Sequence, residues 1–177
     1  ILTMELENII YPGFNKTLSE LNALSKVKKK SCEIIDLTEI EWVRDVLRHR
    51  IEEIGSYDIK FKKPTDEEIH SVSKIVGADI DMDELKNNFH KNKRIIGITS
   101  GKGGVGKSTI TSLLGIAFDE LGKKVGIMDS DIWGYSVPKI LGAKFPPIPF
   151  NERIFPSRIN NLNVISCLLY TSPSPRD

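Results

Sequence analysis

Apolar positions in the first third of the chain follow two different spacings. A short apolar run, Ile34, Ile35 and Leu37, comes after a lysine-rich segment. The apolar positions beyond it recur every three or four residues and therefore predict one face of a helix: Ile40, Val43, Leu47, Ile51 and Ile54. Thr38 and Glu41 have capping-box spacing at its start, and Gly55 provides a stop. Such a helix needs a sheet or another partner to cover its apolar face.

The pattern then continues with alternating short elements. Ile59 to Phe61 predicts a short strand, and Thr65 with Glu68 predicts a capping box for a helix ending near Gly77. Asp81 with Glu84 predicts a third, short helix. We therefore expect a small α/β domain over residues 1–63, followed by a helical linker over residues 64–93.

The hydrophobic pattern changes beyond the linker. A β-branched apolar segment, Arg94 to Thr99, predicts a strand, Lys107 to Leu121 has a helical period ending at Gly122, and Lys124 to Met128 predicts a second strand. A strand, helix and strand in this order predict a right-handed βαβ unit in a parallel sheet. The loop after Thr99 then lies at the carboxyl end of a strand, where α/β folds bind ligands. We expect an incomplete domain of this type over residues 94–166.

Composition narrows the class of protein. The chain has 177 residues, a formal net charge of +1 and 40% hydrophobic residues, which are typical of a soluble globular protein with one or two modest domains. The sequence contains no apolar run of membrane-spanning length and no signal-peptide pattern, so we expect a cytoplasmic protein without a membrane partner. The near-neutral charge gives no reason to expect a nucleic-acid partner. Cys32 and Cys167 are far apart and form no metal-binding pair.

A glycine-rich loop carries the clearest chemistry. Residues 101–108 read GKGGVGKS and match the P-loop pattern G-x-x-x-x-G-K-[ST]. Glycines allow successive N–H groups to wrap a phosphate chain at a helix N-terminus. Lys107 is expected to reach the β- and γ-phosphates, Ser108 to bind Mg²⁺, and Thr109 to contact an inner phosphate. The predicted ATP-binding set is Gly101, Lys102, Gly103, Gly104, Val105, Gly106, Lys107, Ser108 and Thr109.

Two carboxylates follow the second predicted strand. Asp129 and Asp131 stand two residues apart, so on an extended segment both would face the Mg²⁺ and γ-phosphate side of the loop. The alternative interpretation is an acidic turn or a helix cap.

Lys102 directly follows the first glycine of the loop, and in this the loop resembles the deviant Walker A group of P-loop ATPases. The resemblance implies a nucleotide-sandwich homodimer in which Lys102 stabilises charge on the partner's transferring phosphoryl group. It also implies that Asp131 orients or deprotonates the attacking water and that Asp129 holds the water shell of the metal. The catalytic residues would be Lys102, Lys107 and Asp131, and the Mg²⁺ residues Ser108 and Asp129. Alternatively, Lys102 is an exposed loop lysine.

Residues 131–142, DIWGYSVPKILG, closely resemble the D-I-[YW]-G-x-S-[IV]-P-x-[ML]-[LM]-G block of the Mrp family. This resemblance implies a P-loop ATPase that carries iron–sulfur clusters to apo proteins. The family holds its cluster with a C-x-x-C pair in a more C-terminal region, so cluster binding is expected only of the full-length parent. Two alternatives are a positioning ATPase of the MinD or ParA type, and a fragment that binds nucleotide weakly or does not fold.

Both ends of the chain carry further expectations. Residues 167–177, CLLYTSPSPRD, resemble a translated sequencing adapter. We therefore expect the natural sequence to be cut near Ser166, inside the strand-like run Leu162 to Ser166, and the tail to be disordered. The N-terminal domain resembles the cluster-assembly domain found in many Mrp proteins. The usual Asp-Pro-Glu and Thr-Pro-x-Cys motifs are missing from it, so Cys32 is interpreted as a buried small residue.

Overall fold

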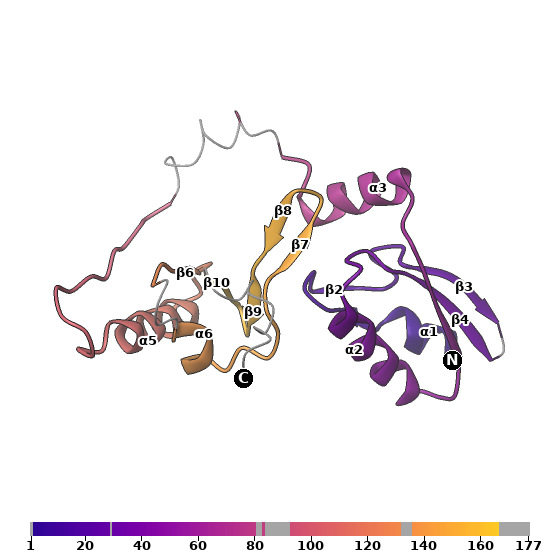
Figure 1. Cartoon of the computed structure of the whole chain (residues 1–177), viewed down its shortest axis with the longest axis horizontal. Coiled ribbons are helices and arrows are strands. Elements are labelled where there is room, and N and C mark those ends of the chain that lie inside the picture. Colours follow the sequence, from indigo (N-terminus) through magenta and orange to yellow (C-terminus); the bar gives the residue numbers. More distant parts are fainter. Residues whose placement is uncertain (1, 29, 81–82, 84–92, 132–135, 167–177) are drawn as a thin grey trace, which may run out of the picture. The chain divides into compact units, whose positions relative to one another are not determined.

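The computed structural model describes residues 2–28, 30–80, 83, 93–131 and 136–166 (Figure 1). The chain folds into two compact units. The first contains residues 1–86 together with 149–153, and the second contains residues 87–148 and 154–177. The predicted mixed α/β class is confirmed, because helices and sheets are found in both units. The described residues form no helix that is long and apolar enough to cross a membrane.

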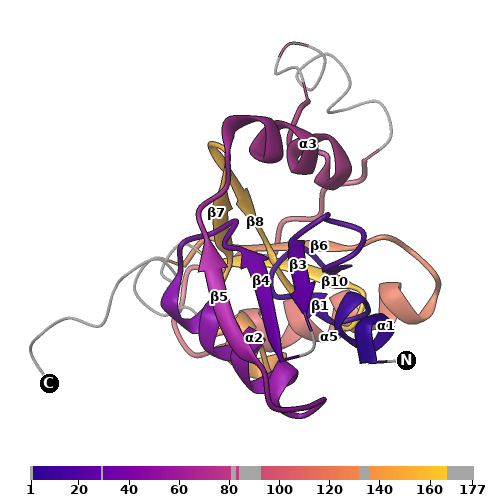
Figure 2. The ribbon, with the colours of Figure 1, turned by 90° about the vertical axis from the view of Figure 1, so that its right-hand side faces the viewer.

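The first unit is built on a three-stranded sheet with the order β3-β4-β5 (Figure 2). β3 is antiparallel to β4, whereas β5 is parallel to β4 and is reached through helix α2. Val43, Leu47 and Ile51 of the helix are buried, which confirms the predicted apolar face. The bounds are β3 (Leu24–Lys28), β4 (Ser31–Ile35), α2 (Glu41–Glu52) and β5 (Asp58–Lys62).

Short N-terminal elements complete the core of this unit. Tyr11 is fully buried, and its hydroxyl accepts a hydrogen bond from the Leu37 N–H at 2.9 Å. Burial and the nearby Asp36 carboxylate raise the pKa of Tyr11, so the phenol stays protonated. This contact ties the N-terminal segment to the chain just beyond β4. The short elements are α1 (Leu2–Glu7), β1 (Ile10–Tyr11) and β2 (Lys16–Thr17), with β1 antiparallel to β2.

Helix α3 (Asp66–Val76) confirms the local signals in its sequence. The Thr65 hydroxyl accepts from the Glu68 N–H at 3.3 Å, and the Glu68 carboxylate accepts from the Thr65 N–H at 2.8 Å. Gly77, at φ +71°, takes the left-handed conformation that ends the helix. Both predicted boundaries of this helix are therefore correct. The third helix expected from Asp81 and Glu84 lies outside the described residues.

The predicted capping box of α2 is wrong. Ile40 is the N-cap residue and no side chain caps the helix. Asp36 already accepts the Glu39 N–H at 3.0 Å, and Glu39 sits at φ +54°. Because this turn redirects the backbone just before the helix, Glu41 does not reach back to the chain and instead pairs with Arg44 at 3.0 Å.

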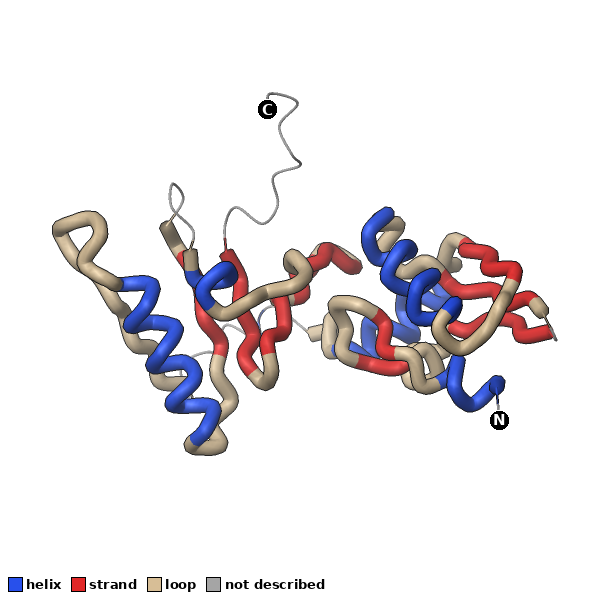
Figure 3. The backbone as a smooth tube through the Cα atoms, turned by 90° about the horizontal axis from the view of Figure 1, so that it is seen from below, coloured by secondary structure: helices blue, strands red, loops and turns tan. Residues whose placement is uncertain are grey.

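The second unit contains a three-stranded sheet with the order β6-β10-β9. β10 is parallel to β6 and antiparallel to β9. Its small core consists of Ile127, Val137, Leu162 and Val164, and helix α5 packs against β6 and β10 (Figure 3). The bounds are α5 (Lys107–Glu120), β6 (Gly126–Asp129), α6 (Val137–Ile140), β9 (Ser157–Ile159) and β10 (Leu162–Ser166).

The strand predicted at Arg94 to Thr99 is not formed, so the predicted βαβ unit around α5 is wrong. Residues 93–99 have no regular secondary structure, and Ile95 and Ile96 are 70% and 52% exposed. β-branched residues favour an extended backbone, but a strand also needs a hydrogen-bonded neighbour. Within the described ranges, β6 pairs with β10 and not with this segment.

A further hairpin was not predicted from sequence. It consists of β7 (Ile148–Phe150) and β8 (Arg153–Phe155), joined through Asn151 and Glu152, both with positive φ. Its residues 149–153 belong to the first unit, where the Phe150 ring meets the Phe14 ring edge-on with centroids 5.1 Å apart.

Candidate nucleotide-binding site

The glycine-rich loop leads directly into α5. Gly104 and Gly106 have φ values of +72° and +91°, in the left-handed region that residues with a side chain rarely adopt. Gly106 is the N-cap, so α5 begins at Lys107 as predicted. No side chain caps the helix. Its first N–H groups are therefore available to a phosphate, with the positive end of the helix dipole behind them.

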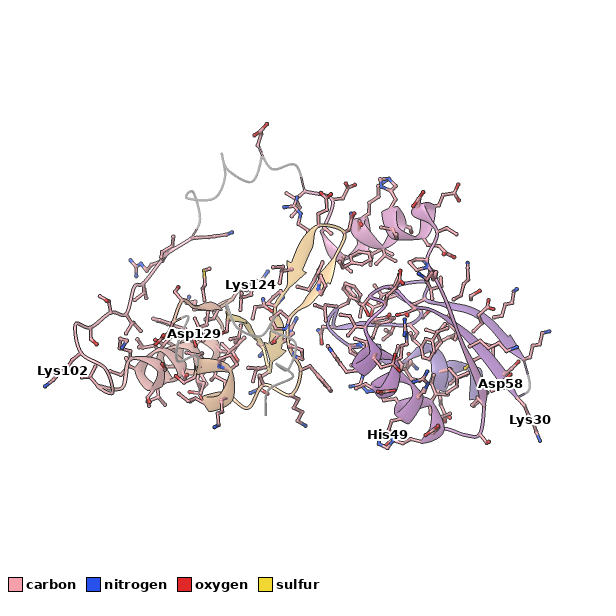
Figure 4. The ribbon with its side chains drawn as sticks, in the orientation of Figure 1. Lys30, His49, Asp58, Lys102, Lys124 and Asp129 are labelled. Carbon is pink, nitrogen blue, oxygen red and sulfur yellow. The ribbon has the colours of Figure 1, made fainter. Side chains whose placement is uncertain are left out.

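The side chains predicted to contact nucleotide emerge from this loop and from the first turn of α5. Lys107 and Ser108 are half-buried, whereas Lys102 and Thr109 are exposed. Figure 4 shows the Lys102 side chain pointing outward from the loop. The Ser100 hydroxyl donates to the Lys102 carbonyl at 2.7 Å, which holds the backbone of the loop at that residue.

Hydroxyl groups one turn further along α5 bond back to the first turn. Thr111 donates to the Lys107 carbonyl at 2.9 Å, and Ser112 donates to the Ser108 carbonyl at 2.8 Å. These bonds satisfy two buried or half-buried hydroxyls inside the helix itself. Ser108, the second residue of α5, is half-buried and is the metal ligand that the sequence predicts.

Asp129 is the last residue of β6 and is 7% exposed. One carboxylate oxygen, Oδ2, accepts the backbone N–H groups of Ser136 at 3.1 Å and Val137 at 3.2 Å. The other oxygen, Oδ1, accepts the Asp131 N–H at 3.2 Å. The carboxylate therefore connects the end of β6 both to the following turn and to the start of α6.

The prediction that Asp129 and Asp131 face the same way from one extended segment is wrong. β6 ends at Asp129, and Asp131 lies beyond it in an exposed position. The hydrogen bond from the Asp131 N–H to the Asp129 carboxylate turns the backbone, so the alternation of an extended chain no longer applies. The alternative interpretation of Asp129 as a turn and helix cap describes its contacts.

This role of Asp129 could have been suspected from the sequence. Ser136, Val137 and Pro138 resemble a helix start, since Pro is favoured in the first helical turn. Ser136 does not use its own side chain as the cap, and the buried Asp129 supplies the acceptor. No local pattern links residues seven and eight positions apart in this way, so the tertiary structure was needed to find the pair.

A cluster or metal site is not assembled by the described residues. They hold no group of three or more His, Cys, Asp or Glu side chains that could bind a metal ion. Cys32 is 2% exposed, and burial, together with the Asp58 charge, raises the pKa of its thiol. A thiol held in its protonated form is a poor metal ligand, which agrees with its interpretation as a packing residue. Cys167, Trp133 and Tyr135 lie outside the described residues, as does the tail predicted to be disordered.

The chain is similar to known proteins along most of its length. Residues 91–174 match a ParA family model described as NUBPL iron-transfer P-loop NTPase. An iron–sulfur cluster carrier protein of Aquifex aeolicus is 27% identical over 94% of this chain and 50% of its own length. The protein of the same name from Helicobacter pylori is 30% identical over 93% of this chain and 46% of its own length.

A third relative, the iron–sulfur cluster carrier protein of Methanocaldococcus jannaschii, is 47% identical over 41% of this chain. The chain spans about half the length of the Aquifex and Helicobacter relatives. No solved structure matches it. The segment that matches the family model, residues 91–174, includes the glycine-rich loop, α5 and Asp129, so the similarity covers the whole candidate nucleotide-binding site.

Proposed function

We propose that the full-length protein binds and hydrolyses ATP in the cytoplasm and carries iron–sulfur clusters to apo iron–sulfur proteins. The observation that carries this proposal is the backbone at Gly104 and Gly106, which leads into an uncapped helix inside the segment that matches the family. The names of the relatives, which are iron–sulfur cluster carrier proteins, support the cluster as cargo. They favour this function over a positioning ATPase.

The residues of the loop fit a phosphate chain and a hydrated cation. The N–H groups of the loop and of the first turn of α5 would bind phosphate oxygens, and Lys107 would add a point charge beside them. Ser108 is the side chain assigned to Mg²⁺, which when bound would neutralise charge on the phosphate oxygens. Gly101, Gly103 and Val105 contribute backbone, and Thr109 contributes a hydroxyl near the inner phosphates.

Hydrolysis requires a water to be oriented and a developing charge to be stabilised. We assign the first task to Asp131, which is exposed beyond the end of β6, where it can reach a water molecule. The second is assigned to Lys102, whose outward direction suits a phosphoryl group bound by a partner subunit. The active form would accordingly be a homodimer.

The cluster is treated as cargo of the full-length protein. The described residues offer no set of thiolate ligands, and Cys32 is buried with a raised pKa. Iron–sulfur clusters are held by thiolates. We therefore assign the cluster ligands to residues outside the described ranges.

The first test compares two lysines of one loop in the full-length protein. Lys107→Ala should abolish ATP binding measured by calorimetry, because it removes the charge between the phosphates. Lys102→Ala should leave binding within about twofold of wild type and lower kcat on the order of 10³-fold, because its charge acts only in the transition state. Equal loss of binding in both variants would contradict the cross-dimer role.

The second test concerns the cargo. The full-length protein reconstituted with iron and sulfide should show the charge-transfer absorption of a thiolate-bound cluster, and an apo iron–sulfur protein should acquire that cluster on mixing. If the protein binds ATP but takes up no cluster, it is a P-loop ATPase without the carrier function, and that part of the proposal is disproved.

A further inference from the structure

Asp129 is the only charged side chain that the described part of the second unit buries. Removing a carboxylate from water is costly unless hydrogen bonds replace the lost solvation. Here three backbone N–H groups, from Asp131, Ser136 and Val137, supply that replacement. Of about four lone-pair positions on a carboxylate, three are then in use. A group engaged in this way has little capacity left to hold the water shell of a metal.

The three donors belong to two segments with different tasks. Ser136 and Val137 begin α6, whose Val137 side chain is 2% exposed and lies in the core with Ile127. The hydrogen bonds between the Asp129 carboxylate and these three N–H groups are called the tether below. Packing of α6 therefore fixes the end of the tether at Ser136 and Val137. The third donor, the Asp131 N–H, belongs to an exposed residue that lies beyond the strand.

The first N–H groups of α6 need an acceptor from outside the helix. The Ser136 side chain forms no capping bond, and Pro138 in the same turn has no N–H. Val137 is buried and Ser136 is half-buried, so their N–H groups need an acceptor within the protein. Asp129 satisfies both of them with a single oxygen, at 3.1 and 3.2 Å.

We propose that Asp129 is a positioning residue, whose carboxylate fixes the backbone of Asp131 relative to the anchored start of α6 and so places the Asp131 carboxylate for hydrolysis. The proposal rests on the proposed ATPase function, because Asp131 is assigned to the attacking water there. It replaces the role in the metal's water shell that the resemblance to the deviant Walker A group implied for Asp129. A shift of about 1 Å in a catalytic group can cost on the order of 10²-fold in rate.

Two substitutions separate positioning from metal binding. Asp129→Asn keeps the shape but replaces one acceptor oxygen by an N–H₂ group, which cannot accept from a backbone N–H. Asp129→Glu keeps the charge, and with it any affinity for Mg²⁺, but moves the carboxylate outward by one CH₂ group. Ser130→Ala is the matched control, since Ser130 is an exposed residue between the two aspartates.

The experiment measures ATP hydrolysis by the full-length protein over a range of Mg²⁺ concentrations, together with amide hydrogen exchange. In both Asp129 variants kcat should fall on the order of 10²-fold, with KM for ATP and half-saturation by Mg²⁺ within about twofold of wild type. Amide exchange over residues 136–140 should become at least about tenfold faster, while β9 and β10 stay protected. Ser130→Ala should behave as wild type.

Other results would overturn the proposal. If Asp129→Asn raises the Mg²⁺ requirement about tenfold while exchange over residues 136–140 is unchanged, Asp129 binds the hydrated metal instead. A wild-type kcat in Asp129→Glu with normal exchange would also contradict a positioning role. If the wild-type protein hydrolyses no ATP, the proposed function fails, whereas the exchange data still show whether the tether exists.

Discussion

The two sheets of this protein cover their apolar residues to different degrees. In the first unit, Ile34 of β4 and both Leu47 and Ile51 of α2 are fully buried. In the second unit, Leu113 of α5 is 60% exposed and Met128 of β6 is 71% exposed. Each unit combines helices with a three-stranded sheet. An apolar pattern therefore specifies which residues can be buried, whereas the neighbouring elements decide which of them are buried.

The exposed residues of α5 follow from how this helix meets its sheet. Its buried residues are small, Ser112 and Gly115. A Cβ atom on Gly115 would lie 2.6 Å from Ile127 Cδ1, so the helix comes close to β6 at this point. The large side chains of α5 lie outside this contact: Ile110, Leu113, Leu114, Ile116 and Leu121 are between 37% and 70% exposed. The first unit instead packs large side chains of α2 into its core.

The largest expected effect tests this contrast directly with one substitution in each helix. Leu47→Ala should lower the free energy of unfolding of the first unit by about 3 kcal/mol, because it leaves a cavity in a closed core. Leu113→Ala should change the stability of the second unit by less than about 0.5 kcal/mol, since this side chain is already mostly in water. Amide exchange of peptides from β4 and from β6 during urea titration measures each unit separately. Similar losses in both variants would contradict the contrast.

A smaller effect is expected at the close contact of the second unit. Gly115→Ala should destabilise that unit by about 1 kcal/mol, because overpacking against Ile127 outweighs the better helix propensity of alanine. The double variant Gly115→Ala with Ile127→Val removes the Cδ1 atom that the new methyl group would meet. It should recover stability relative to the sum of the single changes in a double-mutant cycle. If the stability losses of the two single variants simply add up in the double variant, Gly115 does not lie in close contact with Ile127.

The smallest effect concerns the capping box of α3. Hydrogen bonds from Lys62 and from the Thr65 N–H hold the pKa of Glu68 below its usual value. Because the folded-state pKa is the lower one, this stabilisation is present above the unfolded-state pKa of about 4.3 and is lost as pH falls through the folded value. Glu68→Gln should therefore be less stable than wild type at pH 7. Its free energy of unfolding should also decline less than that of wild type as the pH falls below about 4.5. Glu67→Gln, at an exposed neighbouring position, is the control. Identical pH profiles for Glu68→Gln and wild type would contradict this origin.

Most elements with complete local signals were predicted correctly. Helix α3 has a capping box at one end and a left-handed glycine at the other, and both are observed. Helix α5 begins after Gly106 and is followed by Gly122 at φ +72°. Strand β10 occupies the predicted apolar run Leu162 to Ser166. In these cases the hydrogen-bond partners lie within a few residues or the apolar run is buried, so sequence was sufficient.

Predictions were wrong where a partner outside the recognised local pattern, near or distant in sequence, determines the outcome. The segment from Arg94 to Thr99 has β-branched residues but pairs with no described strand. Thr38 and Glu41 have the spacing of a capping box, yet the buried Asp36 carboxylate accepts the Glu39 N–H and forms a different turn before α2. Strands β7, β8 and β9 are only three residues long each, too short for an alternating pattern to be recognised.

The glycine-rich loop, the start of α5 and the two aspartates near the end of β6 could all be found from sequence, because backbone freedom at glycine and the first turn of a helix are local properties. Only the tertiary structure showed that Asp129 is buried and bound to the N–H groups of Ser136 and Val137. A carboxylate has the same chemistry beside a metal or at a helix start. Its role is set by which donors the fold brings within hydrogen-bond distance, and that depends on the packing of α6 against the core.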